Sequence, residues 1–330
     1  MNKTMHHMVV QQIQDGQLDL ISTRHLNWPE ISRVSILSED FIRKYDWLIH
    51  WGAICKYQKL SEPFIEEFRE HISWYWICRK QVLSESFIEK NALKLGWSDI
   101  SAHQKLSNDF IDKYADLLDW PGLSGHQSMS EPIIEKYTDR VRWGVLSWSQ
   151  DLSEAFIEKH MYKLDIYGVS ARQVLSESFM IKHQDRLIWN YLSSKQTLSE
   201  SFISRWARLV NWYDISYAQK LSEPFIEEYI DQLDWVGIVS RQVLSEPFIE
   251  KYIDHTDWLS ICNYQKLSES FMQLHEDDIN WISISKHQKL SEMFIIKNIG
   301  RLRWEYICKY QELTNRIHEV YDECCSQKAH

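Results

Sequence analysis

Glycine and proline are scarce in this chain, with 9 Gly and 6 Pro among 330 residues. Such scarcity argues against a loop-rich or largely disordered protein. Nowhere do about 18 apolar residues run together, so we expect no membrane-spanning helix. The first residues, MNKTMHHMVVQQI, contain neither a basic leader nor an apolar stretch, so we expect no signal peptide. These absences predict a soluble protein of the cytoplasm that does not enter a membrane.

Basic charge and the common catalytic motifs are also lacking. The formal net charge is -10, so the whole protein exerts no attraction on nucleic acid or anionic lipid, and any such contact needs a local basic strip. The chain has no CxxC, HExxH, GxSxG, GxxxxGK[ST] or GxGxxG motif. We therefore expect no enzyme activity, no cofactor and no metal site.

What the chain does contain is a repeat of 23 residues, because leucine recurs at that spacing with Met129 filling the single gap. The leucines are at 37, 60, 83, 106, 152, 175, 198, 221, 244, 267, 290 and 313. Numbering each repeat from its leucine, Trp occupies position 15 in nearly every unit, and Gln occupies position 22 from Gln58 to Gln311. A period of this size is typical of solenoids and other repeat architectures.

Each repeat is predicted to hold two short helices. Apolar positions 5, 6, 9 and 13 form one helical stripe, and positions 15, 18, 19 and 22 form a second. Ser at position 2 and Asn or Asp at position 14 are typical N-caps. All six prolines fall two residues after one of these caps, where a missing N–H costs little. We predict helix A over positions 3 to 12 and helix B over positions 15 to 22.

The expected fold is an all-α solenoid, a stack of about thirteen two-helix repeats in one continuous domain, because a single pair of helices cannot bury its Phe, Trp and Leu alone. Residues 1–36 are predicted to form an N-terminal cap with a degenerate first repeat. Residues 37–312 form twelve tandem repeats, and residues 313–330 a C-terminal partial repeat or cap.

The array "LSExFI … W..IS..Q.LSE" over residues 37–317 resembles tandem-repeat proteins encoded by giant DNA viruses and some large phages. The resemblance implies a viral or phage origin, and with it a host factor as the expected partner. It brings no catalytic motif.

The residues that recur in every unit are predicted to serve the stack. We expect Gln at position 22 to tie helix B to the next link through backbone hydrogen bonds. Cys55, Cys78, Cys262 and Cys308 stand at position 19, where other units have Ser, and are expected to be small buried substitutes. Cys324 and Cys325 are expected to be free thiols. Histidines at position 9, His160, His183 and His275, should pack beside the core with a polar tip outward.

Function is predicted in the columns that vary and remain exposed, positions 16, 17, 20 and 21 of helix B. These columns are rich in aromatic and basic residues and hold few acids, while helix A carries most of the acidic charge at positions 3, 7 and 11. The candidate partner-binding residues are Lys56, Tyr57, Tyr75, Trp76, Arg79, Lys80, Trp148, Tyr167, Arg172, Tyr191, Lys195, Tyr213, Tyr217, Arg241, Tyr264, Lys286, Tyr306, Lys309 and Tyr310.

Four interpretations of the aromatic and basic residues of helix B and the acidic residues of helix A remain open. Tyr, Trp and Arg are enriched at protein interaction hot spots, which favours a non-enzymatic scaffold that binds a protein. The same residues stack on bases and neutralise phosphates, so nucleic acid is the alternative partner. The acidic ridge of helix A could instead mimic nucleic acid. A plainer reading is that basic residues near the end of helix B complement its dipole, with Tyr at the edge of the core.

Overall fold

The computed structural model describes residue 12, residues 27–312 and residues 314–320. Within these residues all regular secondary structure is helical, which confirms the predicted all-α solenoid. The chain divides into two compact units, Met1–Gly168 and Val169–His330. The prediction of a single uninterrupted domain stays a prediction. Most of the predicted N-terminal cap, much of the C-terminal cap, and Cys324 and Cys325 lie outside the described residues.

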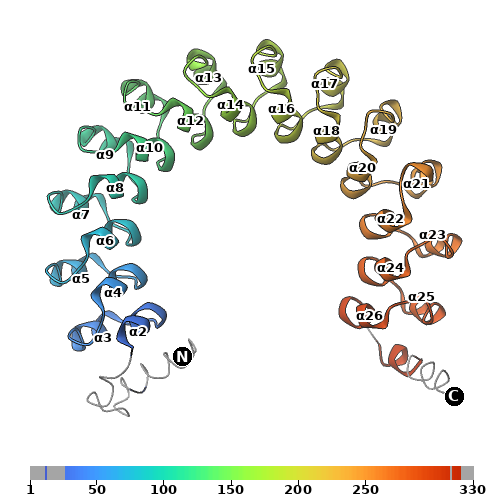
Figure 1. Ribbon diagram of the computed structural model, residues 1–330, viewed down its shortest axis with the longest axis horizontal. Helices are drawn as coiled ribbons and strands as arrows, with labels where there is room; N and C mark the ends of the chain where they lie inside the picture. The colour runs from blue at the N-terminus through green and yellow to red at the C-terminus, as the bar shows by residue number, and fades with distance from the viewer. Residues whose placement is uncertain (1–11, 13–26, 313, 321–330) are drawn as a thin grey trace. The chain divides into compact units, whose positions relative to one another are not determined.

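The first unit alternates A and B helices along the chain (Figure 1). Its A helices are α3 (Glu39–Lys44), α5 (Glu62–Glu67), α7 (Glu85–Lys90), α9 (Asn108–Lys113), α11 (Glu131–Lys136) and α13 (Glu154–His160). Its B helices are α2 (Trp28–Val34), α4 (Trp51–Tyr57), α6 (Trp74–Lys80), α8 (Trp97–His103), α10 (Trp120–His126) and α12 (Trp143–Ser149). The boundary between the units falls within α14 (Ile166–Arg172).

The second unit repeats the same alternation. Its A helices are α15 (Glu177–Lys182), α17 (Glu200–Arg205), α19 (Glu223–Glu228), α21 (Glu246–Lys251), α23 (Glu269–Leu274) and α25 (Glu292–Lys297). Its B helices are α16 (Trp189–Lys195), α18 (Trp212–Ala218), α20 (Trp235–Arg241), α22 (Trp258–Tyr264), α24 (Trp281–His287) and α26 (Trp304–Tyr310). A short 3-10 helix, η2 (Ile253–His255), follows α21.

Helix A is shorter than predicted, because it ends at about position 8 rather than 12. In the repeat at Leu37 the C-cap residue Tyr45 leaves the helical region, with φ -127 and ψ 32. The chain then continues as a turn in which the N–H of Leu48 bonds the carbonyl of Tyr45 at 2.9 Å. This turn brings the apolar side chain at position 13, here Ile49, into the core.

The predicted caps and the limits of helix B are confirmed. Ser38 accepts a hydrogen bond from the N–H of Phe41, and the same bond recurs in most repeats at the N-cap of helix A. Asn27, Asp119 and Asn211 do the same for helix B. Helix B runs from position 15 to 21, and the glutamine at position 22 is its C-cap.

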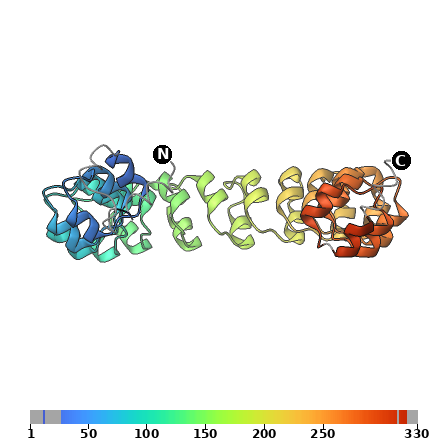
Figure 2. The same ribbon diagram turned by 90° about the horizontal axis from the view of Figure 1, so that it is seen from below.

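In each unit the helices form two rows, with the B helices on the concave side of that unit and the A helices on the other (Figure 1). Figure 2 shows that they run across the direction in which the repeats follow one another. Successive B helices pack against each other, and the fully buried apolar residue at position 18, such as Ile54 or Ile77, lies in this interface. The hydrophobic core of each unit therefore runs from repeat to repeat between the packed helices and is not gathered at one central point.

Candidate binding surface

The glutamine at position 22 joins consecutive repeats, as predicted. The Gln104 amide donates to the carbonyls of Cys78 and Gln81 at 2.6 and 2.8 Å, and its oxygen accepts from the N–H of Leu83 at 2.9 Å. The side chain is 3% exposed. One amide thus satisfies three backbone groups that end one helix B and begin the next helix A. The same arrangement recurs from Gln58 to Gln288 wherever the bonds are described.

Position 19 supplies a second link between repeats. Ser101 Oγ donates to the carbonyl of Trp97 and accepts from the N–H of Asp119, the helix B cap of the next repeat. Cys55 takes the same place, with its sulfur 3.3 Å from the N–H of Ser73, so the cysteines at this position act as buried substitutes for serine. Cys308 is the exception to the prediction. It is exposed, because it lies in α26, the last helix B that the structure describes.

The Trp at position 15 lies between repeats. Trp97 stacks on Phe110 and Tyr114 of the following helix A, with ring centroids 6.4 and 5.4 Å apart. In several repeats the indole N–H of the Trp at position 15 also donates a hydrogen bond to a carbonyl in the turn that follows the preceding helix A. Trp120, for example, donates to the carbonyl of Ala115. The histidines at position 9 occupy the same place as Tyr114: His160 is buried and lies 4.8 Å from Trp143.

The glutamate at position 3 does more than complement the helix dipole. Glu62 accepts from both the N–H and the hydroxyl of Ser84, one repeat later, and most repeats have this contact. Where Asn108 replaces the glutamate, its oxygen accepts from the N–H of Ser130 alone. The sequence prediction did not include this contact, although the recurrence of Ser at position 2 beside Glu at position 3 is the sign of it in the sequence.

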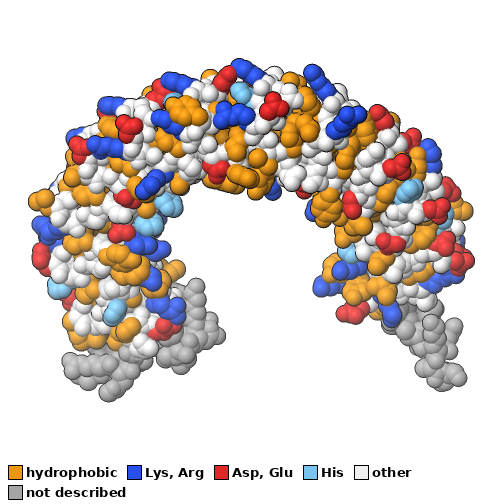
Figure 3. Space-filling view, turned by 45° about the horizontal axis from the view of Figure 1, so that its top comes forward, with side chains coloured by type: hydrophobic (Ala, Val, Ile, Leu, Met, Phe, Trp, Pro, Cys, Tyr) orange, Lys and Arg blue, Asp and Glu red, His pale blue; other side chains and the backbone are white. Residues whose placement is uncertain are grey.

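The acidic ridge expected on helix A is largely neutralised by its neighbours. Most acids at position 7 pair with a lysine at position 8 of the next repeat, as Asp112 does with Lys136 at 2.6 Å and Glu89 with Lys113 at 2.8 Å, whereas Glu250 faces a repeat with Leu274 at that position. Figure 3 shows acidic and basic side chains interspersed on the visible face rather than in separate bands. Helix A therefore presents alternating charges, and the expected segregation of charge is wrong on this face.

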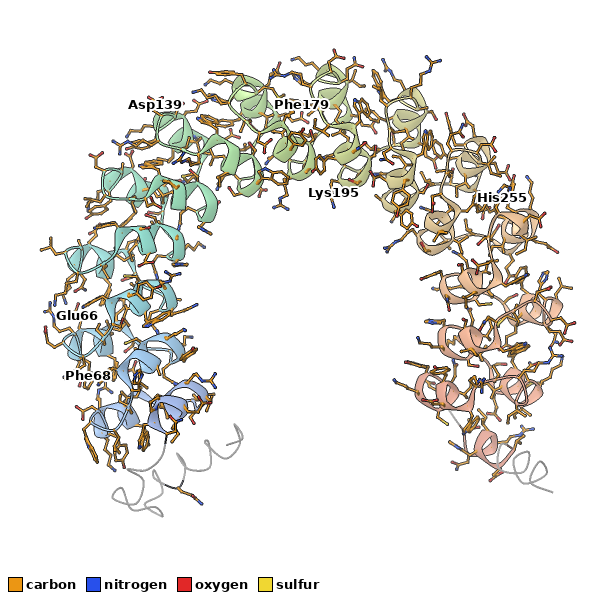
Figure 4. The ribbon with its side chains drawn as sticks, in the orientation of Figure 1. Glu66, Phe68, Asp139, Phe179, Lys195 and His255 are labelled. Atoms are coloured by element: carbon orange, nitrogen blue, oxygen red, sulfur yellow. The ribbon has the colours of Figure 1, made fainter. Side chains whose placement is uncertain are left out.

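All the candidate residues of helix B are exposed or half-buried. Tyr57, Tyr75, Lys80, Trp148, Tyr167, Arg172, Lys195, Tyr213, Arg241, Tyr264, Lys286, Lys309 and Tyr310 are exposed. Lys56, Trp76, Arg79, Tyr191, Tyr217 and Tyr306 are half-buried. Figure 4 places Lys195 on the concave side of its unit and Glu66, on helix A, on the opposite side of its own.

Two groups of these residues come together in the first unit. Lys56 Nζ lies over the ring of Trp76 in the next repeat, 4.3 Å from its centroid, and also 5.0 Å from the ring of Tyr57. These side chains line a shallow cavity of about 390 Å³. Arg79 lies over Tyr75, 4.9 Å from its centroid, and pairs with Asp99 at 3.2 Å. Cations held against aromatic faces are thus preassembled on the surface.

A third group is in the second unit. The rings of Tyr213 and Tyr217 are 4.7 Å apart. Burial raises the pKa of Tyr217 to about 12, helped by the negative charge of Asp234. Tyr306 and Tyr310 form a further pair at 6.3 Å. Lys309 Nζ lies over the ring of Tyr310, 5.2 Å from its centroid.

The exposed surface of helix B also holds aliphatic residues that the sequence prediction left out. Val145, Val236, Leu259 and Ile282 are 41 to 59% exposed and stand at positions 16 or 17, the columns already singled out. Their positions in these columns are the sequence signal for them, whereas the prediction named aromatic and basic residues alone. With them, the exposed surface of the B row combines apolar, aromatic and cationic side chains.

The described residues contain no group of His, Cys, Asp and Glu that could hold a metal ion. In the part of the chain that is described, no helix is both long enough and apolar enough to cross a membrane. Comparison with protein-family models, curated proteins and solved structures finds no match to this chain.

Proposed function

We propose that this chain is a non-enzymatic repeat scaffold that binds a protein partner through the exposed face of the B row. The observation that carries the proposal is that the residues that recur from repeat to repeat and the residues that vary have different contacts. Recurring residues such as Gln104, Ser101 and Glu62 form hydrogen bonds with neighbouring repeats. Among the residues that differ between repeats, those at positions 16 and 21 of helix B are almost all exposed and those at position 20 are mostly half-buried, whereas position 17 is buried or half-buried except at Val145, contrary to the prediction.

The chemistry of that face supports a protein rather than a small molecule. It combines exposed Tyr and Trp with basic side chains that have no carboxylate partner in the described structure, including Lys80, Lys195, Arg241 and Lys286. Rigid aromatic side chains bury a large area at low entropic cost, and free basic groups at the rim select an acidic partner surface. The resemblance to viral repeat proteins makes a host protein the partner that we would seek.

Affinity capture with the purified chain as bait tests the proposal. A variant with Tyr75→Ala, Tyr213→Ala and Tyr264→Ala should lose its captured partner, because each exposed hot-spot aromatic contributes about 2 kcal/mol or more. A matched control removes exposed apolar residues from the helix A side, Leu93→Ser and Tyr162→Ser. This control should retain the partner. Loss with the control and retention with the helix B variant would contradict the proposal.

Nucleic acid is the second candidate, favoured by the stacked cation–aromatic group of Lys56, Tyr57 and Trp76. An anisotropy titration with single-stranded RNA and DNA at two salt concentrations separates the two candidates. Tight binding that weakens steeply with salt would replace the protein partner with a nucleic acid. Mimicry of nucleic acid by helix A has less support, because most carboxylates at position 7 are paired with lysines.

A further inference from the structure

Five of the Trp side chains at position 15 are covered by a basic side chain from the following repeat, whereas Trp97, Trp189 and Trp212 are followed by Leu or Gln at the equivalent position. The covering side chain stands at position 12 and is lysine, arginine or histidine. The described pairs are Lys94 over Trp74 at 5.8 Å, Lys163 over Trp143 at 5.0 Å, Arg301 over Trp281 at 5.5 Å, His71 on Trp51 at 5.5 Å and His255 on Trp235 at 4.9 Å. A cation over an indole face is attracted by the negative face of the ring.

Trp143 shows the complete arrangement. Lys163 Nζ lies over its ring, and the ring of His160 packs against it at 4.8 Å. One position before His160, Lys159 forms an ion pair with Glu135 at 2.6 Å. Two lysines of one repeat thus supply the positive charge for an indole and a carboxylate of the repeat before it.

Around Trp258 the positions equivalent to Lys159 and Lys163 hold no basic residue. His275 is retained and lies 4.7 Å from the Trp258 ring. Lys159 is replaced by Leu274, and Lys163 by Asp278. Among the described residues no cation pairs with Glu250, which is the counterpart of Glu135. Trp143 and Glu135 each have a lysine of the following repeat against them, whereas Trp258 and Glu250 have no such lysine.

A cavity of about 560 Å³ lies at this point. Its lining includes Glu250, Asp254, Thr256, Trp258, His275 and Asp278. Thr256 stands at position 13, which is Ile, Leu or Val in the other repeats from 37 to 312, and it follows the 3-10 turn η2. His275 is one of the lining residues, and its Nδ1 lies 3.9 Å from the carboxylate of Asp278. The lining therefore combines an indole, an imidazole and three carboxylates.

We propose that this cavity binds a lysine or arginine side chain of a polypeptide partner, with its cation over Trp258 in the place that Lys163 takes over Trp143. The aromatic face attracts the cation, and the carboxylates of Glu250, Asp254 and Asp278 supply the opposite charge. A metal ion does not fit, because the described acidic and imidazole groups do not converge closely enough to hold one. The cavity lies outside positions 16, 17, 20 and 21, so this inference is independent of the proposed function.

NMR of the chain labelled with ¹⁵N-tryptophan tests the proposal, with the Trp258 and Trp143 indole resonances assigned from Trp→Phe variants. The probe is a blocked pentapeptide with arginine at its centre, flanked by glycine and serine, and the reference peptide carries glutamine instead. The Trp258 resonance should shift saturably with the arginine peptide and not with the glutamine peptide. Trp143, already covered by Lys163, should stay unchanged. Equal shifts at both residues, or no shift at Trp258, would overturn the proposal.

Matched variants give a second measurement. Asp278→Lys supplies the missing cation from within the chain and should raise the apparent Kd of the arginine peptide by about tenfold or more. Asp231→Lys makes the same charge change at an exposed site outside the cavity and should alter the Kd less than about threefold. The repeat at Trp143 shows that lysine is compatible with the fold at this position. If the two variants weaken binding equally, the peptide responds to net charge alone and the proposal is wrong.

Discussion

At the scale of single residues, each glutamine at position 22 satisfies buried backbone groups that the helices leave unpaired. Gln219 accepts from the N–H of Leu198 at 3.0 Å and donates to the carbonyls of Ser193 and Gln196 at 2.9 and 2.7 Å. A leucine of similar size would fill the space and leave three polar groups without partners. Each such group costs about 1–3 kcal/mol when it is buried.

We therefore expect Gln219→Leu to lower the free energy of unfolding by at least about 2 kcal/mol. Denaturant titration followed by circular dichroism measures the change. Gln232→Leu is the control, because Gln232 is exposed and should change stability by less than about 0.5 kcal/mol. Similar losses for the two variants would show that the buried amide contributes nothing beyond its volume.

The cysteines at position 19 should differ sharply in reactivity. Burial raises the pKa of the thiols of Cys55 and Cys78, and raises the pKa of Cys262 to about 11. A raised pKa leaves less of the reactive thiolate at neutral pH, and burial also excludes the reagent. Iodoacetamide labelling read by peptide mass spectrometry should modify the exposed Cys308 first. Labelling of Cys262 as fast as Cys308 in the folded chain would contradict this.

Tyr217 gives a prediction with a defined pH window. Because its folded pKa of about 12 lies above the ordinary value of 10.0 for a tyrosine, folding favours the protonated phenol. The stabilisation from this group is therefore complete below pH 10 and disappears as the pH rises through the folded pKa. The phenolate absorbance lost in Tyr217→Phe should accordingly develop only near pH 12. A difference spectrum that appears in full near pH 10 would show an ordinary phenol.

At the scale of the element, the turn after helix A depends on the apolar residue at position 13. Leu233 and Ile279 are buried there, whereas Thr256 is half-buried. Next to it the turn becomes the 3-10 helix η2, and Asp257 caps α22 with φ -120 and ψ 151 instead of the φ -88 and ψ 107 of Asn211. A hydroxyl at this position is less favourable in the core than a methyl-rich side chain.

We expect Thr256→Leu to raise the free energy of unfolding by about 1 kcal/mol, because it restores the apolar column. Leu233→Thr makes the opposite change in the neighbouring repeat and should lower stability by about 1–3 kcal/mol. Denaturant midpoints of the two variants and the parent chain provide the measurement. If Thr256→Leu is the destabilising member of the pair, the local backbone of η2 is adapted to threonine.

At the scale of the whole molecule, repeats depend on their neighbours and hardly on more distant parts of the chain. The Gln, Ser and Glu contacts join residues 18 to 26 positions apart, so removing a whole repeat brings equivalent partners together again. We expect deletion of residues 198–220, one full period, to preserve the helical circular dichroism per residue. Deletion of residues 198–208, about half a period, should lose much of it. Equal behaviour of the two deletions would contradict a stack of equivalent units.

Much of the fold could be predicted because the same local pattern recurs from repeat to repeat. Ser38, Asn27 and the glutamine column revealed the caps and the limits of helix B without any tertiary information. The length of helix A was overestimated, because the stripe of positions 5, 6, 9 and 13 is compatible with both a helix and a helix followed by a turn. The candidate residues were found on one exposed row, but their pairing, such as Lys56 with Trp76, was not foreseen.

By itself, then, the sequence determined the repeat length, the helical class, the caps and the division between recurring and variable positions. These depend on contacts within one unit, which a local pattern records. Only the tertiary structure decided which residues of neighbouring repeats contact each other. It shows that Glu62 bonds Ser84, that lysines pair with acids of helix A, and that Trp258 lacks the cation that covers Trp143. Those contacts depend on the offset between stacked repeats, and the offset is set by how the buried side chains of neighbouring helices pack.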